Sequence, residues 1–334
     1  MQENQKVRVG VIGAGGITQV SHIPNLSSVE AVDLVAVCDS EVARAVSIAD
    51  RFGVSEWYDD PEVMLKKSDL DCVVIATPTI THLPLCQMAL EREVDVMVEK
   101  PFARNSDEAK RIIHFAEKNE KLLMVGMNHR FREDVAFLKE IINTGDLGEY
   151  FMVRSGWLKR LGVWGRPYWF MDPTLAGGGV LIDLGLQMID LVLYLLDQRT
   201  VVEGTCGLSN KMLDLEVEDT ASIFLRFDDD TTLLLEVSWA NCETDDKAYT
   251  FISGAQGSAS LNPLRINSRW GDRVMTETAP VLADGVELYR QSFRTEIIHF
   301  IDCVQNRREP LSSGRDALAS IEIVDKLYAA SEGI

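Results

Sequence analysis

The feature that most constrains this fold is an apolar strand that runs directly into a glycine-rich turn. VRVGVIG (7–13) has the composition of a buried strand, and the turn that follows it contains Gly13, Gly15 and Gly16. The first two of these glycines suit a tight turn and a close approach of the backbone to a pyrophosphate at a helix N-terminus. The next strand ends in Asp39, whose carboxylate can accept hydrogen bonds from both hydroxyls of a ribose. The pattern predicts a dinucleotide-binding βαβ unit.

Details of this motif bear on which dinucleotide it selects. Its third small-residue position is Thr18, a departure from the fingerprint, since the third glycine serves close packing of helix on strand. A carboxylate at Asp39 repels a 2′-phosphate and therefore favours NAD. Ser40 and Arg44 lie close enough in sequence to receive such a phosphate, so NADP stays possible. The alternative is a Rossmann domain whose site is empty.

Strand-like and helix-like segments alternate through the first part of the chain. The strands are rich in Val, Ile and Leu without strict alternation, which is typical of parallel strands buried on both faces. They are expected at 7–13, 34–39, 72–77, 94–100 and 121–127. Helices are expected between them, at roughly 16–28, 41–52, 60–67, 81–92 and 106–118. The alternation predicts a doubly wound parallel sheet in a Rossmann domain over residues 1–127.

The pattern changes after about residue 130, where strands with turn signals dominate. A helix is expected at 133–143, and strands at 149–158, 201–210, 219–227, 231–239, 247–253 and 257–261. DDDTT (228–232) has the composition of a hairpin turn. These segments predict an α+β domain over 128–313 with a large, mostly antiparallel open sheet. A last helix within 314–334 is expected to pack back on the Rossmann domain.

Composition excludes several classes of partner. The chain has 334 residues, enough for two domains, and a net charge of −19, which argues against nucleic acid or an anionic membrane. The polar N-terminus is not expected to act as a secretory signal, and the longest apolar run, 180–196, is interrupted by acids. None of the six cysteines forms a C-x-x-C pair, which favours reduced thiols and a cytoplasmic location. The five histidines show no metal-ligand spacing, so no metal is expected.

Chemistry-bearing residues follow two further strands of the first domain. ATPTITH (76–82) places Thr77, Pro78 and His82 after the third long strand, and EKP (99–101) follows the fourth. Ligands bind at the carboxyl ends of such strands, so Lys100 is expected near the nicotinamide ring of a bound cofactor. For His82 the alternative is a half-solvated residue at a helix N-terminus.

These motifs occur in an order that resembles a known family. GAGGI (13–17), CD (38–39), ATPTITH (76–82), EKP (99–101), NHRF (128–131) and GGGVLIDLGLQMID (177–190) are similar to motifs of the glucose-fructose oxidoreductase / inositol dehydrogenase / MocA (Gfo/Idh/MocA) family. The resemblance covers essentially the whole chain. It implies NAD(P)-dependent oxidation or reduction of sugars, cyclitols or related polyols, and a C-terminal sheet that mediates a homodimer or homotetramer.

The resemblance also implies roles for individual residues. Lys100 and Asp183 match the active-site lysine and aspartate of the family, while Gln187 stands where the family usually has a catalytic histidine. The implied cofactor contacts are Gly13, Gly15, Gly16, Ile17, Asp39, Ser40, Thr77, Pro78, His82, Glu99, Lys100, Asn128, Trp164 and Arg166. For Trp164 and Arg166 the alternative is an aromatic loop that packs on the second domain.

The run 180–197 carries a polar stripe on an otherwise apolar helix. Asp183, Gln187, Asp190, Tyr194 and Asp197 are spaced by 4, 3, 4 and 3 residues, so they share one face of a helix. Asp183 and Gln187 are expected to face a substrate cleft. Asp190 and Asp197 are expected to bond neighbouring backbone or to face solvent. The three preceding glycines, 177–179, would let this loop approach a ligand closely.

The identity of the acid/base is the open question. Gln187 cannot take up a proton at any ordinary pH. We expect Lys100 to donate and accept the proton, with Asp183 and Gln187 as partners of substrate hydroxyls. The alternatives are His129 as the base, a different reaction, or a non-enzymatic NAD(P)-binding sensor of the same fold.

Overall fold

The structure, a computed structural model, describes residues 6–162, 168–278 and 284–331. Trp164 and Arg166, two of the predicted cofactor contacts, lie outside the described residues.

The chain divides into two compact units. Unit 1 comprises Met1–Asn128 and Arg290–Ala317, and unit 2 comprises His129–Tyr289 and Leu318–Ile334.

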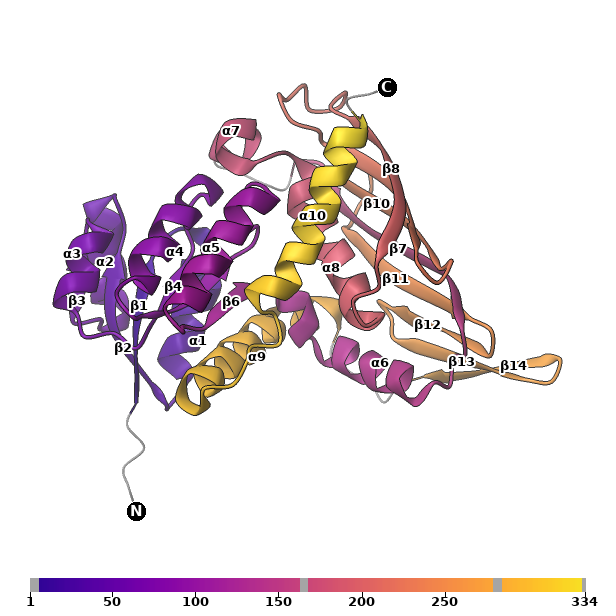
Figure 1. Cartoon of the computed structure of the whole chain (residues 1–334), viewed down its shortest axis with the longest axis horizontal. Coiled ribbons are helices and arrows are strands. Elements are labelled where there is room, and N and C mark those ends of the chain that lie inside the picture. The colour runs from indigo at the N-terminus through magenta and orange to yellow at the C-terminus, as the bar shows by residue number, and fades with distance from the viewer. Residues whose placement is uncertain (1–5, 163–167, 279–283, 332–334) are drawn as a thin grey trace, which may run out of the picture. The chain divides into compact units, whose positions relative to one another are not determined.

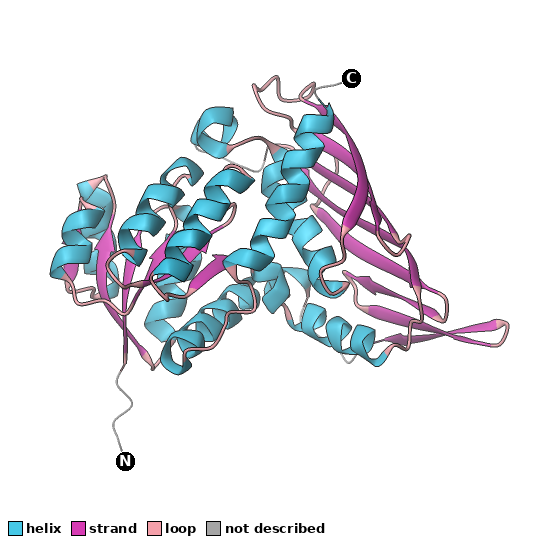
Figure 2. Ribbon diagram, viewed as in Figure 1, coloured by secondary structure: helices cyan, strands magenta, loops and turns pink. Residues whose placement is uncertain are grey.

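Unit 1 is built on a six-stranded parallel sheet with helices on both faces (Figures 1 and 2). Its strand order is β3-β2-β1-β4-β5-β6, and the strands are β1 (Val7–Ile12), β2 (Val32–Cys38), β3 (Glu56–Tyr58), β4 (Cys72–Ile75), β5 (Asp95–Glu99) and β6 (Leu123–Gly126). The helices between them are the π-helical turn η1 (Thr18–His22), α1 (Ile23–Ser28), α2 (Val42–Phe52), α3 (Pro61–Lys67), the short η2 (Thr79–Thr81), α4 (His82–Leu90) and α5 (Ser106–Lys118). The predicted doubly wound sheet is confirmed; β3 is a short edge strand without a sequence prediction.

Capping residues explain where three helices of unit 1 begin or end. The Asp60 carboxylate accepts the backbone N–H groups of Glu62 and Val63 at the start of α3, and the Asn105 side chain accepts the N–H of Glu108 at the start of α5. Gly53 ends α2 in the left-handed conformation, with φ at 69°.

A C-terminal segment completes unit 1. The backbone N–H of Val125 donates to the carbonyl of Ser312, and the Ser312 hydroxyl donates back to the carbonyl of Val125. Arg307 forms an ion pair with Asp95 of β5. Residues 290–317 therefore belong to unit 1, and the packing of a last helix within 314–334 on the Rossmann domain stays a prediction. From Leu318 onward the last helix belongs to unit 2.

Unit 2 is built on an eight-stranded sheet in the order β14-β13-β12-β11-β7-β10-β9-β8. β7 and β10 pair in parallel and the other neighbours are antiparallel, which confirms the predicted mostly antiparallel sheet. The strands are β7 (Tyr150–Arg160), β8 (Val201–Ser209), β9 (Thr220–Phe227), β10 (Thr232–Asn241), β11 (Lys247–Gly254), β12 (Gly257–Leu261), β13 (Arg265–Trp270) and β14 (Arg273–Thr278).

One face of this sheet is covered by helices and the other is open (Figures 1 and 2). Along β10, Leu233, Leu235 and Val237 are buried whereas Leu234 and Glu236 are exposed, as the alternation of a strand requires.

The remaining helical elements of the chain are η3 (Asn128–Phe131), α6 (Glu133–Thr144), η4 (Tyr168–Met171), α7 (Pro173–Ala176), the π-helical η5 (Leu181–Gly185), α8 (Leu186–Leu195), α9 (Gly285–Asn306) and α10 (Gly314–Ser331). The long α9 had no sequence prediction.

Among the described residues, 173–195 is the one helical stretch with the length and apolar content of a membrane span. Because 94% of its apolar 18-residue window is buried inside the protein, it has the character of a core helix. All six cysteines are free thiols, and all except Cys242 are buried.

Candidate active site

The glycine turn after β1 leaves its backbone open on one side. Gly13 has a φ of 96°, and a Cβ there would lie 2.3 Å from the carbonyl oxygen of Ala76, so only glycine fits. A Cβ on Gly15 or Gly16 would meet no atom within 4 Å. This open backbone at a helix start suits a pyrophosphate, so the residues fit the predicted dinucleotide.

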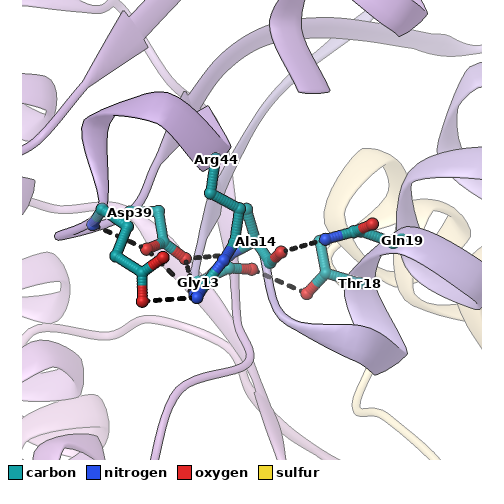
Figure 3. A network of polar contacts seen from close by, with 7 residues as sticks. Gly13, Ala14, Thr18, Gln19, Asp39 and Arg44 are labelled. Atoms are coloured by element: carbon teal, nitrogen blue, oxygen red, sulfur yellow. Dashed lines mark hydrogen bonds and ion pairs between the residues drawn. The ribbon is translucent and has the colours of Figure 1, made fainter. Parts of the chain in front are cut away.

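Thr18 and Gln19 hold this turn in place (Figure 3). The Thr18 hydroxyl donates to the carbonyl of Gly13 at 2.6 Å, and the Gln19 amide donates to the carbonyl of Ala14 at 2.8 Å. Thr18 is fully buried. Thr18 therefore replaces the third glycine of the fingerprint, and its hydroxyl forms a hydrogen bond with the turn.

Asp39 ties the end of β2 to the same turn (Figure 3). Its carboxylate accepts the N–H of Ala14 at 2.8 Å and the N–H of Glu41 at 2.9 Å. The Arg44 guanidinium lies 3.2 Å from the same carboxylate and also pairs with Glu41. The positive charge that would receive a 2′-phosphate is therefore shared between two carboxylates, which favours NAD.

The segment after β4 places Thr77 and Pro78 at the carboxyl end of that strand, both half-buried. His82 is buried: its Nδ1 lies 3.0 Å from the carbonyl oxygen of Pro101, and its Nε2 lies 2.9 Å from that of Thr77. Burial lowers the pKa of His82 against the opposing effect of these carbonyls. The half-solvated alternative is wrong. The ring lies between the two segments that follow β4 and β5, with a carbonyl oxygen beside each ring nitrogen.

EKP follows β5, and the Lys100–Pro101 peptide is cis. One Glu99 oxygen accepts the backbone N–H of Lys100 at 3.1 Å, and the other lies 2.8 Å from Nε2 of His22. Burial favours the neutral acid, but the bond and charge of His22 and the charge of Lys100 outweigh it and hold the pKa of Glu99 below its usual value. Glu99 is thus an anion that braces the lysine's peptide.

A second acid, Glu296 of α9, is buried near this carboxylate. Its side chain is fully buried, and neither carboxyl oxygen has a hydrogen-bond partner among the described residues. Burial, followed by the charge of Glu99, raises the pKa of Glu296 well above its usual value. Glu296 is therefore a neutral acid in the folded protein.

Replacing Glu296 with glutamine is expected to stabilise the protein increasingly as pH rises. In the unfolded chain the carboxyl ionises near its ordinary pKa, about 4.3, while the folded chain keeps the proton. The free energy of unfolding of the wild type therefore falls as the pH rises above about 4.3, by at most about 1.4 kcal/mol per pH unit. Urea unfolding at about pH 5 and about pH 8 measures this, with Asp302→Asn on the same helix as control. An advantage of Glu296→Gln that does not change with pH would contradict a buried neutral acid.

Asn128 and His129 are both buried, and each contacts side chains of the protein itself. The Asn128 amide donates to the hydroxyl of Ser292 at 2.9 Å within unit 1. The His129 ring packs edge-on against Trp157, with centroids 5.0 Å apart, and against Tyr289 at 5.7 Å. This aromatic packing corresponds to the structural alternative for His129 rather than to a base.

Asp183 and Gln187 begin the polar stripe of unit 2. One Asp183 carboxylate oxygen accepts the indole N–H of Trp239 at 3.0 Å. The Gln187 amide donates to the backbone carbonyl of Asp183 at 2.8 Å, and its side-chain oxygen has no partner among the described residues. Both side chains are buried, so each presents at most a small surface to a ligand.

The prediction for Asp190 is wrong. Its carboxylate is buried and accepts two guanidinium N–H groups of Arg130, at 2.8 and 2.6 Å. The NHRF motif therefore supplies the counter-charge that makes a buried carboxylate tolerable. Asp197 is exposed at the end of the helix, beside Lys139, which agrees with a solvent-facing residue.

The glycines before this helix make room for the protein itself. A Cβ on Gly178 would lie 2.1 Å from the Tyr328 hydroxyl, and one on Gly179 would lie 2.2 Å from the carbonyl of Glu218. Gly178 and Gly179 thus have a packing reason, and the close approach of a ligand to this loop stays a prediction. Burial raises the pKa of Glu218, against the lowering effect of the donors on its carboxyl.

Sequence reasoning did not find the partners of the predicted residues. His22, Glu296, Glu218 and Tyr328 stand in no recognisable motif, and Trp239 could not be ranked among several aromatic residues. Only Arg130 left a signal, since a buried run with several acids requires a cation.

Comparisons with known proteins identify the family. Residues 7–127 match the Gfo/Idh/MocA oxidoreductase family, NAD-binding Rossmann fold, and residues 135–260 match the Gfo/Idh/MocA C-terminal domain. The chain belongs to the Gfo/Idh/MocA family. Unit 1 is accordingly the NAD-binding domain of a Gfo/Idh/MocA oxidoreductase, and the fold and recognition predicted from the motifs are confirmed.

Full-length relatives of this Gfo/Idh/MocA protein are named dehydrogenases. The D-glucoside 3-dehydrogenase of Escherichia coli (strain K12) is 29% identical over 98% of this chain and 95% of the relative. The D-apiose dehydrogenase of Paraburkholderia graminis is 26% identical over 98% and 89%. An oxidoreductase from Agrobacterium radiobacter, solved in complex with NAD+, L-tartaric acid and magnesium, has a TM-score of 0.88 at 23% identity over 98% and 97%. That structural likeness supports the fold.

Proposed function

We propose that this oxidoreductase transfers a hydride between the nicotinamide of NAD and a carbinol or carbonyl carbon of a sugar, cyclitol or related polyol. The observation that carries the proposal is the meeting of three motifs at one edge of unit 1. Neighbouring strands β1, β4 and β5 end in the open glycine turn, in Thr77–Pro78 and in Glu99–Lys100. Carboxyl ends of neighbouring parallel strands form the ligand-binding edge of such a sheet. The names of the relatives support the substrate class.

In this proposal the cofactor accepts or returns the hydride, and the protein handles the proton. Lys100 takes the proton of the reacting hydroxyl and returns it in the reverse direction. Asp183 and Gln187 bind substrate hydroxyls. The Gln187 side-chain oxygen has no partner among the described residues and can accept a hydrogen bond from one of these hydroxyls. NAD is preferred over NADP because the Asp39 carboxylate would repel a 2′-phosphate and Arg44 is already paired with two carboxylates.

A substrate panel tests the proposal. Glucosides, aldoses, inositols and other polyols are incubated with NAD or NADP, and the absorbance of the reduced cofactor is followed. Reduction of NAD by at least one member supports an oxidoreductase of this class. Binding of NAD(H) without turnover of any member contradicts it and favours the alternative, an NAD(P)-binding sensor.

We also propose that the protein resides in the cytoplasm.

The open face of the large sheet is proposed to join copies of this chain in a dimer or tetramer. Phe224, Leu234, Arg154 and Phe251 lie side by side across four strands on that face, and Leu234 is 48% exposed. Three of these four side chains are apolar, and apolar side chains gathered on an exposed sheet face mark a site of association.

Leu234→Glu is expected to lower the molar mass in solution, because a charge in an apolar interface loses its water without gaining a partner. Light scattering after gel filtration measures the mass, with the exposed Val42→Glu as control. An unchanged mass of Leu234→Glu, or a monomeric wild type, would refute this interface.

A further inference from the structure

Two consecutive residues, Glu218 and Asp219, hold both structural supports of Asp183. Asp183 stands on η5, one turn after Gly179, whose carbonyl accepts the Asp183 backbone N–H at 3.1 Å. Its carboxylate is held by the indole of Trp239. The position of this carboxylate therefore depends on where the helix starts and on where Trp239 lies.

Glu218 fixes the start of the helix. Its carboxylate accepts the backbone N–H of Gly179 at 3.1 Å and that of Leu181 at 2.9 Å. Its backbone carbonyl accepts the N–H of Val180 at 2.9 Å. Three successive N–H groups that a helix start would leave unsatisfied are thus bound by one residue.

Tyr328 of α10 holds Glu218 in turn. Its hydroxyl donates to the Glu218 carboxylate at 2.7 Å. The same hydroxyl fills the space beside Gly178 that any side chain would need. The glycine run 177–179, the carboxylate and the tyrosine therefore interlock, and movement of one requires movement of the others.

Asp219 fixes the second support. Its backbone carbonyl accepts the N–H of Trp239 at 2.8 Å, and the Trp239 indole then donates to the Asp183 carboxylate at 3.0 Å. The Trp239 and Asp183 side chains are 2% and 7% exposed. The contact is a buried hydrogen bond, and the fixed indole ring gives it a defined direction.

We propose that Glu218, Tyr328 and Trp239 are positioning residues that set the direction of the Asp183 carboxylate for substrate binding. The inference rests on the proposed function, in which Asp183 binds a substrate hydroxyl. It adds that a tyrosine on the last helix of the chain governs this carboxylate through the glycine run. The three residues act through Asp183 and need not touch the substrate.

Steady-state kinetics test the role in turnover. Glu218→Ala and Trp239→Phe are each expected to lower kcat by about 10- to 100-fold, the effect of roughly 1 Å of misplacement of a catalytic group. Tyr328→Phe removes one hydroxyl and is expected to lower kcat by about 3- to 10-fold. The KM for NAD stays within about twofold in all three, because the glycine turn of unit 1 is untouched. Tyr150→Phe on β7, whose hydroxyl only approaches a backbone carbonyl, is the matched control and leaves kcat unchanged.

A second readout does not need activity. The indole N–H resonance of Trp239 is assigned in protein labelled with 15N-tryptophan, as the signal that Trp239→Phe removes. It is expected to shift in Asp183→Asn, in Glu218→Ala and in Tyr328→Phe, and to stay in place in Tyr150→Phe. The variants are first compared with the wild type by circular dichroism, so that unfolded protein is not scored.

These readouts separate the two levels of the proposal. If the wild type turns over no member of the panel, the proposed function fails, and the indole resonance alone decides whether Tyr328 and Glu218 control Asp183. If the chemical shift of the Trp239 indole N–H is unchanged in Tyr328→Phe and in Glu218→Ala, the positioning role is overturned. A shifted resonance with an unchanged kcat also overturns it.

Discussion

Replacing Lys100 with alanine is expected to lower kcat by about 10²- to 10⁴-fold, the usual contribution of a general acid/base. Gln187 cannot exchange a proton, and the His129 ring packs against two aromatic rings, so neither of these two residues is expected to replace the lysine in the proposed reaction. Binding of NADH persists, because the glycine turn and Asp39 do not depend on Lys100. Turnover of the best panel substrate and a fluorescence titration with NADH measure the two effects.

Two further variants make this result specific. Lys100→Arg keeps the charge but not the ability to lose a proton, so it is expected to be about as inactive as Lys100→Ala. Activity retained in Lys100→Arg would instead assign the lysine a purely electrostatic role. Lys118→Ala, on the exposed end of α5, is the matched control. An unchanged kcat in Lys100→Ala would refute Lys100 as the acid/base.

Replacing Asp190 with leucine is expected to cost about 3–5 kcal/mol of stability in unit 2. The Arg130–Asp190 pair is almost completely buried, at 2% and 1% side-chain exposure, so the variant leaves a guanidinium without its counter-charge. The loss appears as a lower urea midpoint of the transition. Two-state behaviour is not assumed for a chain of two units, so the transition of unit 2 is followed separately by hydrogen exchange of α8 peptides.

The paired replacement distinguishes a lost charge partner from lost packing. Arg130→Met combined with Asp190→Leu removes both charges and is expected to recover most of the loss. Asp197→Leu, at the exposed end of the same stripe, is expected to change stability by less than about 1 kcal/mol. An equally small effect of Asp190→Leu would contradict a structural ion pair.

The fold of unit 1 could be predicted because its signals are local. Buried parallel strands produce continuous apolar runs, and Gly13 with Asp39 marks the strand ends that matter. β3 and α9 could not be predicted in the same way. β3 has three residues at a sheet edge, and α9 carries Glu296 in a buried position that charge patterning does not anticipate. The return of 290–317 to unit 1 depends on long-range pairing, such as Val125 with Ser312, which leaves no periodic signal.

The candidate site shows the same division. Motif order located Lys100, Asp183 and Gln187, but spacing could not say what each polar residue of the helix bonds. Asp183 and Asp190 share one face by spacing, yet one accepts an indole N–H and the other a guanidinium from a distant motif. The glycines 177–179 are also compatible with two physical explanations, a ligand's approach or a neighbour's side chain, and the sequence could not show that Tyr328 and Glu218 fill the space beside Gly178 and Gly179.

The proposed reaction moves a hydride between a carbinol carbon and NAD and depends on Lys100 to take up or return the proton. The most direct test supplies NAD and panel substrates deuterated at the carbinol carbons, and examines the recovered nicotinamide by mass spectrometry. Deuterium is expected in the reduced cofactor with the wild type, and almost none is expected with Lys100→Ala over the same time. Absence of deuterium transfer from every panel member, in protein that binds NADH, would contradict it.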